Sequence, residues 1–383
     1  GDRIAFSGST GSGFPHLHFE IRDRQQRPLN PLINGFDVKD TTDPTLVEVA
    51  FLPLDADSRV DGRAVPGFRT LKQSVGNDFA GDPVSLWGRV GVAVKVFDRA
   101  DASALTNRLA PYRLTMSVDN QILFRTTYGA FSYDQVYEVD LDRSFVLNRQ
   151  GRKGFHNLYL ERGNSLPLYD NRPVGSGVIV ARTDGRKPGS FFASGPHTLR
   201  ISAEDAAGNR SDATLDFTIR RTRSFDKVVI EDIHGERVLG GRFSQPLTEP
   251  NSVIVESSKD GQEAWQWIKT VRVKGEGFSM SVSRSSGPFY RVRFDGGPTA
   301  ICSVPQTESG SPGSLEVNSV MYEGRSILTI TSSIALASPP TVARHPHGQV
   351  EVHALSPSEY EAVIPISAGE SIVTIRTRDV RGN

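Results

Sequence analysis

Residues 197–209, HTLRISAEDAAGN, and residues 371–383, SIVTIRTRDVRGN, share the pattern that decides the fold of this chain. In each stretch, apolar and polar side chains alternate and then give way to Asp-x-x-Gly-Asn. Alternation is typical of a strand with one buried face, and Asp, Gly and Asn are typical of turns. The first copy continues into a second alternating run at 214–219, which predicts a β-hairpin. The repeat therefore indicates an all-β chain with at least two related sandwich domains.

The turn residues Asp205 and Asn209, with their counterparts Asp379 and Asn383, allow two interpretations. An Asx turn between strands needs only the side-chain oxygen of the aspartate. A calcium site needs more acidic oxygens than these short stretches supply, so we favour the turn. The second copy stops at Asn383 without a following strand, and we therefore expect a last sandwich that is truncated at its C-terminus.

Further alternating and β-branched runs divide the chain into units. We expect long strands at 46–51, 90–97, 112–118 and 121–127, and a set of short strands at 227–230, 252–256, 278–282 and 290–294. A polar stretch at about 132–188 predicts an insertion that carries short strands. Linkers at 40–44 and 303–313 then separate an incomplete first unit from three β-sandwiches. The predicted units are 1–39, 40–222, 223–305 and 314–383.

Charge and cysteine content argue against several classes of protein. The 383 residues include 44 Lys+Arg and 44 Asp+Glu, a balance that argues against nucleic acid or an anionic membrane surface as a partner. Cys302 is the single cysteine of the sequence, so no internal disulfide forms. We find no apolar run long enough for a membrane span and no signal peptide pattern. Because the first residue is Gly1 rather than Met, we expect a processed or partial chain.

The densest chemistry lies in residues 1–23, GDRIAFSGSTGSGFPHLHFEIRD. We expect strands at 2–8 and 16–21 that are joined by a glycine-rich turn. In the second strand the apolar residues 17, 19 and 21 take one face and leave His16, His18 and Glu20 on the other. Two imidazoles so placed lie about 6.6 Å apart along the strand, which allows them to reach one metal ion. Two edge-strand histidines without a ligand are the alternative.

The run GSTGSGFPHLHFEIR at residues 8–22, followed by Asn30 and Pro31, resembles the end of the M23 family of zinc metallopeptidases. These are the lysostaphin and LytM-like peptidoglycan endopeptidases. The resemblance covers about residues 1–34, and the rest of the chain resembles bacterial immunoglobulin-like modules. It implies that His18 binds zinc and that His16 is the catalytic histidine, which assists a zinc-bound water in attacking a peptide carbonyl. Glu20 is then either a partner that orients an imidazole or a surface carboxylate.

The family supplies its other zinc ligands from an upstream His-x-x-x-Asp pattern, and no histidine in this sequence has an aspartate four residues later. We therefore expect the chain alone to bind zinc weakly and to hydrolyse nothing. The full protein would be a zinc metalloendopeptidase of the bacterial periplasm, cell envelope or exterior that acts on peptidoglycan peptides. Its β-sandwich modules would hold it on the wall or bind an envelope protein. The alternative is a non-enzymatic envelope binding or scaffold protein with a degenerate M23-like domain.

Other conspicuous residues have structural interpretations. We expect Cys302 to be a small core residue. Trp87, Trp265 and Trp267 are expected to be core or edge aromatics, with a sugar-stacking surface as the alternative. His345-Pro-His347 is expected in a solvated loop. The basic residues of the insertion are expected on a solvated surface, with contact to an acidic wall polymer as the alternative; they are Arg143, Arg149, Arg152, Lys153 and Arg162.

Overall fold

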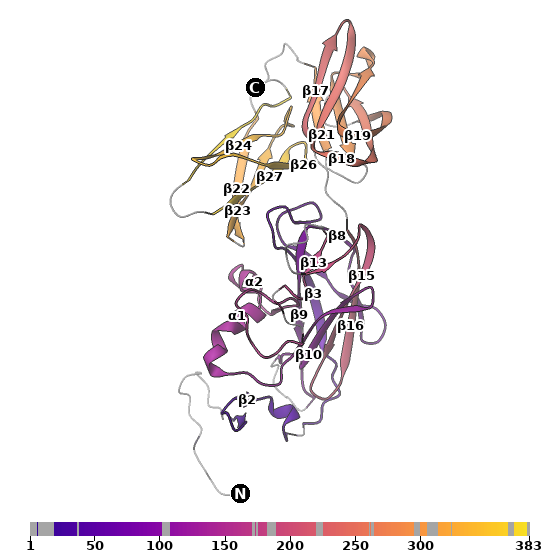
Figure 1. Cartoon of the computed structure of the whole chain (residues 1–383). Coiled ribbons are helices and arrows are strands. Elements are labelled where there is room, and N and C mark those ends of the chain that lie inside the picture. Colours follow the sequence, from indigo (N-terminus) through magenta and orange to yellow (C-terminus); the bar gives the residue numbers. More distant parts are fainter. Residues whose placement is uncertain are drawn as a thin grey trace.

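The computed structural model of this chain describes residues 6, 19–36, 38–101, 108–170, 173, 175–181, 189–219, 225–259, 261, 264–294, 299–304, 313–322, 324–366 and 371–380. Strands account for 57% of the structure and helices for 7%, so the predicted all-β class is confirmed. Figure 1 shows the sheets following one another along the chain, from the indigo N-terminal tail to the yellow C-terminal sheets. None of the helices in the described residues has the length and apolar character needed to cross a membrane.

The N-terminal tail is a small hairpin followed by one helical turn. Strand β1 (Ile21–Arg22) pairs antiparallel with β2 (Pro28–Leu29), and the 3-10 helix η1 (Pro31–Ile33) follows directly. The Asp23 carboxylate accepts the backbone N–H groups of Gln25 and Arg27, which closes the hairpin. Asn30 caps η1 by accepting the N–H of Leu32. Of the strands expected at 2–8 and 16–21, residues 2–5, 7–8 and 16–18 lie outside the described residues.

The segment from 40 to 219 folds as two sheets packed face to face. The strands of the first sheet are β14 (Ser190–Phe191), β13 (Ile179–Val180), β9 (Arg89–Phe97), β3 (Thr45–Pro53) and β5 (Gly67–Thr70), with β12 (Phe155–Asn157) on β9. The strands of the second are β11 (Gln121–Thr127), β10 (Arg113–Val118), β15 (Gly195–Glu204), β16 (Arg210–Ile219), β7 (Asp78–Ala80) and β6 (Lys72–Gln73), with β4 (Arg59–Val60) and β8 (Val84–Trp87) at its side. We call this unit the first sandwich.

The alternation in the sequence decides which side chains fill the core of the first sandwich. Along β15, Leu199, Ile201 and Ala203 are fully buried, whereas the residues between them face outward. These side chains meet those of β3 and β9 in one core. Strands β10 and β11 pair as a hairpin, in which both Asp119 (φ 48°) and Asn120 (φ 68°) adopt the left-handed conformation of a tight turn.

The insertion at 132–188 differs from the prediction, because its first part is helical. It contains η2 (Tyr133–Glu138), α1 (Val139–Asp142) and α2 (Phe145–Arg149) before the short strands β12 and β13. Leu147 of α2 is fully buried against Phe155 of β12 and neighbouring strands. Helices of four to six residues are too short to show a helical periodicity, and tertiary packing stabilises them here.

The middle unit is a single sheet that folds over, so that its two ends pack against each other. Its strands are β17 (Phe225–Ile233), β18 (Glu236–Ser258), β19 (Gln266–Val282), β20 (Phe289–Phe294) and β21 (Thr299–Ser303), with η3 (Arg284–Ser286) before β20. The first half of β18 pairs with β17 and its second half with β20. The register shifts between these halves, where Pro246 and Pro250 lack an N–H. Phe225 of β17 stacks on Phe294 of β20 with ring centroids 4.7 Å apart, so the two ends of the sheet pack face to face.

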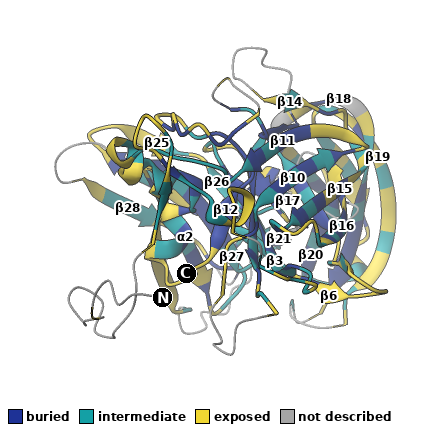
Figure 2. Ribbon diagram, turned by 90° about the horizontal axis from the view of Figure 1, so that it is seen from below, coloured by how far each residue is buried: buried dark blue, intermediate teal, exposed yellow. Residues whose placement is uncertain are grey.

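The expectation of short strands in this unit is wrong for β18 and β19. They span 23 and 17 residues. Pro246 and Pro250 lie within β18 where the register shifts, whereas Gly240 and Gly241 are paired in register, so neither residue type ends the strand. Most of β19 is exposed or half-buried, which Figure 2 shows as the yellow and teal outer strand.

The last unit, which we call the third sandwich, has two sheets. One contains β22 (Leu315–Tyr322), β23 (Arg325–Ser332), β27 (Glu359–Pro365) and β26 (Val352–Ser356). The other contains β25 (Gly348–Val350), β24 (Thr341–His345) and β28 (Ile372–Arg376). Ile330 and Ala362 of the first sheet are fully buried in a core that also contains Val342 of the second.

The third sandwich contacts both of the other units. Arg63 of the first sandwich pairs with Glu359 at 2.6 Å, and the Ala64 N–H donates to the Glu361 carboxylate at 2.7 Å. Against the middle unit, Val380 packs on Phe289 and Ile301. The three units are therefore joined by side-chain contacts as well as by the chain.

Candidate functional site

The two histidines of the M23-like pattern, His16 and His18, lie outside the described residues. The described part of the pattern begins at Phe19 and Glu20. The Glu20 carboxylate accepts hydrogen bonds from the Tyr133 hydroxyl and from Arg22 Nε, the latter at 2.6 Å. The Arg22 guanidinium also lies 5.3 Å from the centre of the Tyr133 ring. The acidic residue of the pattern is thus bonded to the insertion of the first sandwich.

The tail is fixed to the first sandwich by backbone hydrogen bonds. The Asn30 N–H donates to the Gly129 carbonyl at 2.7 Å, and the Asn30 side-chain amide donates to the Tyr128 carbonyl at 3.1 Å. The Phe131 N–H donates back to the Pro28 carbonyl at 3.3 Å, and Leu29 forms a β-bridge with Ala130. Strand β2 therefore extends along residues 128–131, directly after β11. The segment that ends the M23-like pattern is part of the sandwich edge.

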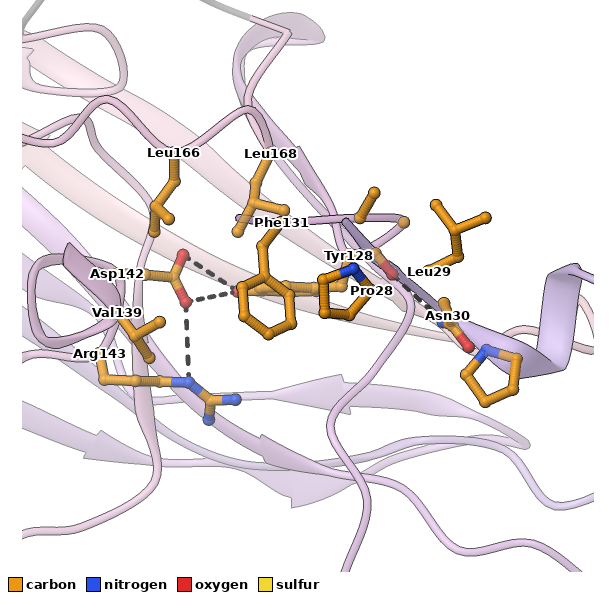
Figure 3. A pocket seen from close by; sticks show the side chains of 13 residues that line it. Pro28, Leu29, Asn30, Tyr128, Phe131, Val139, Asp142, Arg143, Leu166 and Leu168 are labelled. Atoms are coloured by element: carbon orange, nitrogen blue, oxygen red, sulfur yellow. Dashed lines mark hydrogen bonds and ion pairs between the residues drawn. The ribbon is translucent and has the colours of Figure 1, made fainter. Parts of the chain in front are cut away.

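A pocket of about 350 Å³ lies between the tail and the insertion (Figure 3). Its wall is mostly apolar and is made by Pro28, Leu29, Pro31, Phe131, Val139, Leu166 and Leu168. Asp142, Arg143 and the amide of Asn30 supply polar groups. Figure 3 shows the tail residues on one side and the insertion residues on the other, so the docking of the tail creates the pocket.

The polar end of the pocket is centred on the Asp142 carboxylate, at the end of α1. It accepts the Tyr128 hydroxyl at 3.0 Å and the Tyr169 hydroxyl at 2.9 Å. Arg143 Nε lies 3.6 Å from the same carboxylate. Burial raises the pKa of Asp142, while Arg143 and the two hydroxyls oppose that rise. The carboxylate is thus buried and well partnered.

His156 completes this network behind the pocket wall and is fully buried. Because a guanidinium only donates, His156 Nε2 accepts from Arg143 at 2.7 Å, and the ring hydrogen is on Nδ1. Nδ1 then donates to the Tyr128 oxygen at 2.8 Å, and the Tyr128 hydroxyl donates to Asp142. Burial lowers the pKa of His156 well below its ordinary value, with Arg143 adding to the effect. A neutral imidazole bonded at both nitrogens holds the pocket wall and is not positioned as a general base.

Several large apolar side chains on the tail face solvent. Phe19 is 54% exposed and Phe36 is 48% exposed, and their rings contact each other with centroids 5.0 Å apart. Leu32 and Ile33 of η1 are also exposed. A hairpin that leaves four such side chains in water has a surface suited to contact with further protein.

The first Asp-x-x-Gly-Asn turn forms as predicted and is joined by two other aspartates. Asp205 accepts the Asn209 N–H at 2.8 Å and its side-chain amide at 2.6 Å, which is the expected Asx turn. Asp40, from the linker, and Asp98, directly after β9, each place an oxygen within 4.8 Å of one another and of Asp205. Burial and then the neighbouring carboxylates raise the pKa of Asp98 to about 6, although the Arg99 N–H opposes this.

This acidic cluster was not predicted from the sequence. Asp40 and Asp98 lie far from residues 205–209 along the chain, and neither stands in a recognisable pattern. The end of the apolar strand at Phe97 is the one signal that would place Asp98 at a sandwich edge. Among the described residues, these three acidic side chains lie close enough together to share one metal ion. Carboxylate oxygens are not specific to zinc.

The remaining conspicuous residues have structural surroundings. Cys302 is buried, and burial raises the pKa of its thiol, as expected for a core residue. Trp267 is 65% exposed, whereas Trp265 lies under the Arg291 guanidinium at 4.6 Å. The expectation of a solvated surface is wrong for Arg143, which is bonded to buried His156. His345 and His347 are both exposed, but the expected loop is confirmed only for His347, which lies in a turn, because His345 ends strand β24 and pairs with Ile372.

No protein-family model and no curated protein matches this chain. One similar solved structure comes from work on host cell surface retention of a 1.5-MDa bacterial ice-binding adhesin; it is 12% identical, with a TM-score of 0.17 over 76% of this chain and 90% of that chain. Another is a tetra-tandem repeat from the extending region of a large adhesion protein, 12% identical, with a TM-score of 0.17 over 91% of this chain and 90% of that one. Similarity at this level identifies neither a family nor a function.

Proposed function

We propose that this chain contains the C-terminal end of an M23-like zinc metallopeptidase unit, fused to β-sandwich modules that position it in the bacterial periplasm, cell envelope or exterior. Its substrate would be the peptides of peptidoglycan. His18 would bind zinc and His16 would be the catalytic histidine. The other ligands would come from a His-x-x-x-Asp pattern, which we expect in the residues encoded before Gly1.

One observation carries this proposal beyond the sequence resemblance. The tail is hydrogen-bonded along the edge of the first sandwich through Asn30 and Pro28, yet Phe19 and Phe36 beside the pattern remain about half exposed. A larger domain whose last strand includes residues 16–21 would cover these rings. Burial of two such side chains would stabilise the joined units by roughly 2–3 kcal/mol, since each ring is already half buried.

The chemistry that the two histidines would supply follows from their types. Zinc, when bound, lowers the pKa of a coordinated water to about 7 and polarises a peptide carbonyl. An imidazole next to such a centre can accept and return a proton near neutral pH, because its ordinary pKa lies near 6.5. Glu20 is bonded to Tyr133 and Arg22, so its role here would be to hold the strand end on the insertion.

The β-sandwich modules would serve as the support of this enzyme. The insertion contacts the tail through Tyr133, and Phe131 just before it is bonded to Pro28, so the first sandwich and the peptidase end would move as one body. The pocket between them is apolar with one partnered carboxylate, which suits an apolar peptide side chain better than a charged one. The middle unit and third sandwich would contact the wall or an envelope protein.

The test uses the protein with the residues encoded before Gly1, measured for bound zinc and for release of peptides from purified peptidoglycan. His18→Ala is expected to lose the bound zinc and all turnover. His16→Ala is expected to keep zinc and lose turnover by about 10²–10⁴-fold, the range for a general acid–base group. His347→Ala, in the other His-x-His pair, is the matched control and should change neither measurement.

Two outcomes would contradict the proposal. One is the absence of a His-x-x-x-Asp pattern before Gly1. The other is turnover that survives in His18→Ala at the wild-type level. A protein that binds peptidoglycan equally well with and without both histidines and cleaves nothing would instead be a non-enzymatic binding or scaffold protein.

A further inference from the structure

The acidic cluster brings together three aspartates from three separate segments. Asp40 lies in the linker between η1 and β3, Asp98 directly follows β9, and Asp205 directly follows β15. One carboxylate oxygen from each lies within 4.8 Å of the other two. Asp98 is 4% exposed and Asp205 is 3% exposed. Three anions have therefore been placed together at one end of the first sandwich, two of them out of water.

Asp98 carries the observation that points to a ligand. Its Oδ1 is buried and has no hydrogen-bond partner. An unpartnered buried carboxylate oxygen costs several kcal/mol unless a cation compensates it. The negative charges of Asp205, Asp40 and Asp43 repel a negative charge on Asp98. They therefore add to the free-energy cost of keeping the buried Asp98 carboxylate ionised.

Arginines that follow Asp98 and Asp205 in the sequence, or that contact the neighbouring Phe97, interact with other groups. Arg108 lies over the Phe97 ring at 4.3 Å and Arg99 over the same ring at 5.4 Å. Arg210, which follows the Asp205 turn, pairs with Asp212 at 2.9 Å. Within the part of the chain that the structure describes, no lysine or arginine forms an ion pair with Asp40, Asp98 or Asp205.

The ligand atoms of the cluster decide which kind of cation it can bind. All three groups offer oxygen, which is the ligand of calcium and magnesium, whereas structural zinc prefers histidine and cysteine. Two oxygens that bind one Ca²⁺ at 2.3–2.6 Å can lie at most about 5 Å apart, and the separations in the cluster are within that limit. Magnesium demands a near-ideal octahedron, which an irregular set from two loops and a linker does not provide.

We propose that Asp40, Asp98 and Asp205 together bind one calcium ion, which joins the linker to the end of the first sandwich. Asp98 and Asp205 are held by the core strands β9 and β15, whereas Asp40 belongs to a segment without regular structure. The ion would therefore restrict this linker, and with it the tail that precedes it. The site is separate from the two histidines of the proposed zinc centre.

The experiment titrates CaCl₂ into the chelator-treated 383-residue chain by isothermal titration calorimetry, with the thermal unfolding temperature as a second readout. We expect one Ca²⁺ per chain with a Kd on the order of 10⁻⁴ M, as in other extracellular calcium modules, and a higher unfolding temperature with calcium. Asp98→Asn is nearly isosteric and should weaken binding at least about tenfold. Asp82→Asn, at an exposed aspartate, should bind like the wild type.

Further arms separate this site from other metal chemistry. MgCl₂ at equal concentration should raise the unfolding temperature less than CaCl₂ does, and His18→Ala should leave calcium binding unchanged. Absence of calcium binding up to millimolar concentration would overturn the proposal. So would equal binding by Asp98→Asn, or a zinc affinity that falls in Asp98→Asn but not in His18→Ala.

Discussion

The two Asp-x-x-Gly-Asn motifs share their sequence pattern, but the residues that surround their aspartates differ in charge and polarity. In the first, Asp205 meets two other aspartates, and Asp98 beside it has an unpartnered oxygen. In the second, Val380 follows Asp379 and packs on Phe289 and Ile301 of the middle unit. The Ser303 hydroxyl also donates to the Val380 carbonyl at 2.5 Å. Asp205 thus lies where negative charge collects at one end of the first sandwich, whereas Val380 joins two units.

The shared sequence motif therefore does not decide how the region at its aspartate is used; the residues that surround each copy do. Ala206 occupies the position after Asp205 and is half-buried, whereas Val380 at the equivalent position is 8% exposed. The first copy therefore has no large apolar side chain at this position to offer a neighbouring unit. The second has one, and the described residues around it contribute no acidic cluster.

The largest expected effect concerns the other contact that holds the third sandwich in place. Glu361 is fully buried, accepts the Ala64 N–H, and lies 3.5 Å from Arg63 Nε. Glu361→Ala would leave the buried Arg59 guanidinium nearby without its main counter-charge. We expect the free energy of unfolding to fall by about 3–5 kcal/mol in a denaturant titration.

Glu359→Ala is the control for this variant, because Glu359 pairs with the same Arg63 at a more exposed position. Its cost should be at most about 1 kcal/mol. Equal losses in the two variants would show that burial of the Glu361 carboxylate does not make it the stronger contact between the units.

The second expected effect is on the free energy of unfolding when the residue that follows the aspartate is changed in each motif. Val380→Ala removes buried methyl groups from the contact with Phe289 and Ile301, which should cost about 2 kcal/mol. Ala206→Val adds the same groups at a half-buried position and should change stability by less than about 0.5 kcal/mol. Comparable effects from both variants in urea titrations would remove the distinction between the turns.

An effect of similar size is expected from pH, and it should fall on the third sandwich. Burial, together with Arg59, lowers the pKa of His353 from 6.5 to about 3. In the unfolded chain this histidine gains a proton below pH 6.5, whereas in the folded chain it stays neutral down to about pH 3. Stability is therefore full above pH 6.5 and is lost as the pH falls towards 3, by roughly 2 kcal/mol at pH 5.

His353→Gln isolates this contribution from that of the buried carboxylates. The difference in unfolding free energy between pH 7 and pH 5 should be about 2 kcal/mol smaller in this variant than in the wild type. An identical pH dependence in both proteins would show that His353 takes up a proton in the folded state.

The alternation of side chains was sufficient to predict most strands. Four strands lie at the ranges predicted from apolar and β-branched runs; they contain Leu46, Val94, Met116 and Ile201. The insertion was mispredicted because α1 and α2 are too short for a helical period and depend on packing of residues such as Leu147. The length of β18 was missed because Pro246 and Pro250 lie within it at a shift of register.

The candidate sites could be predicted only in part, for a different physical reason. The Asx turn at Asp205 is local, so its residues are adjacent in the sequence. The acidic cluster and the pocket depend on segments that only the completed sandwich brings together. Asp40 and Asp98 meet because β3 and β9 are paired neighbours, and Asn30 meets Tyr128 because β2 extends along residues 128–131.

The most direct test of the contrast between the two turns is a crystal structure of the chain grown with millimolar CaCl₂. We expect one calcium ion about 2.3–2.6 Å from carboxylate oxygens of Asp40, Asp98 and Asp205, and no ion at Asp379. Calcium at Asp379, or none at the three aspartates under these conditions, would contradict it.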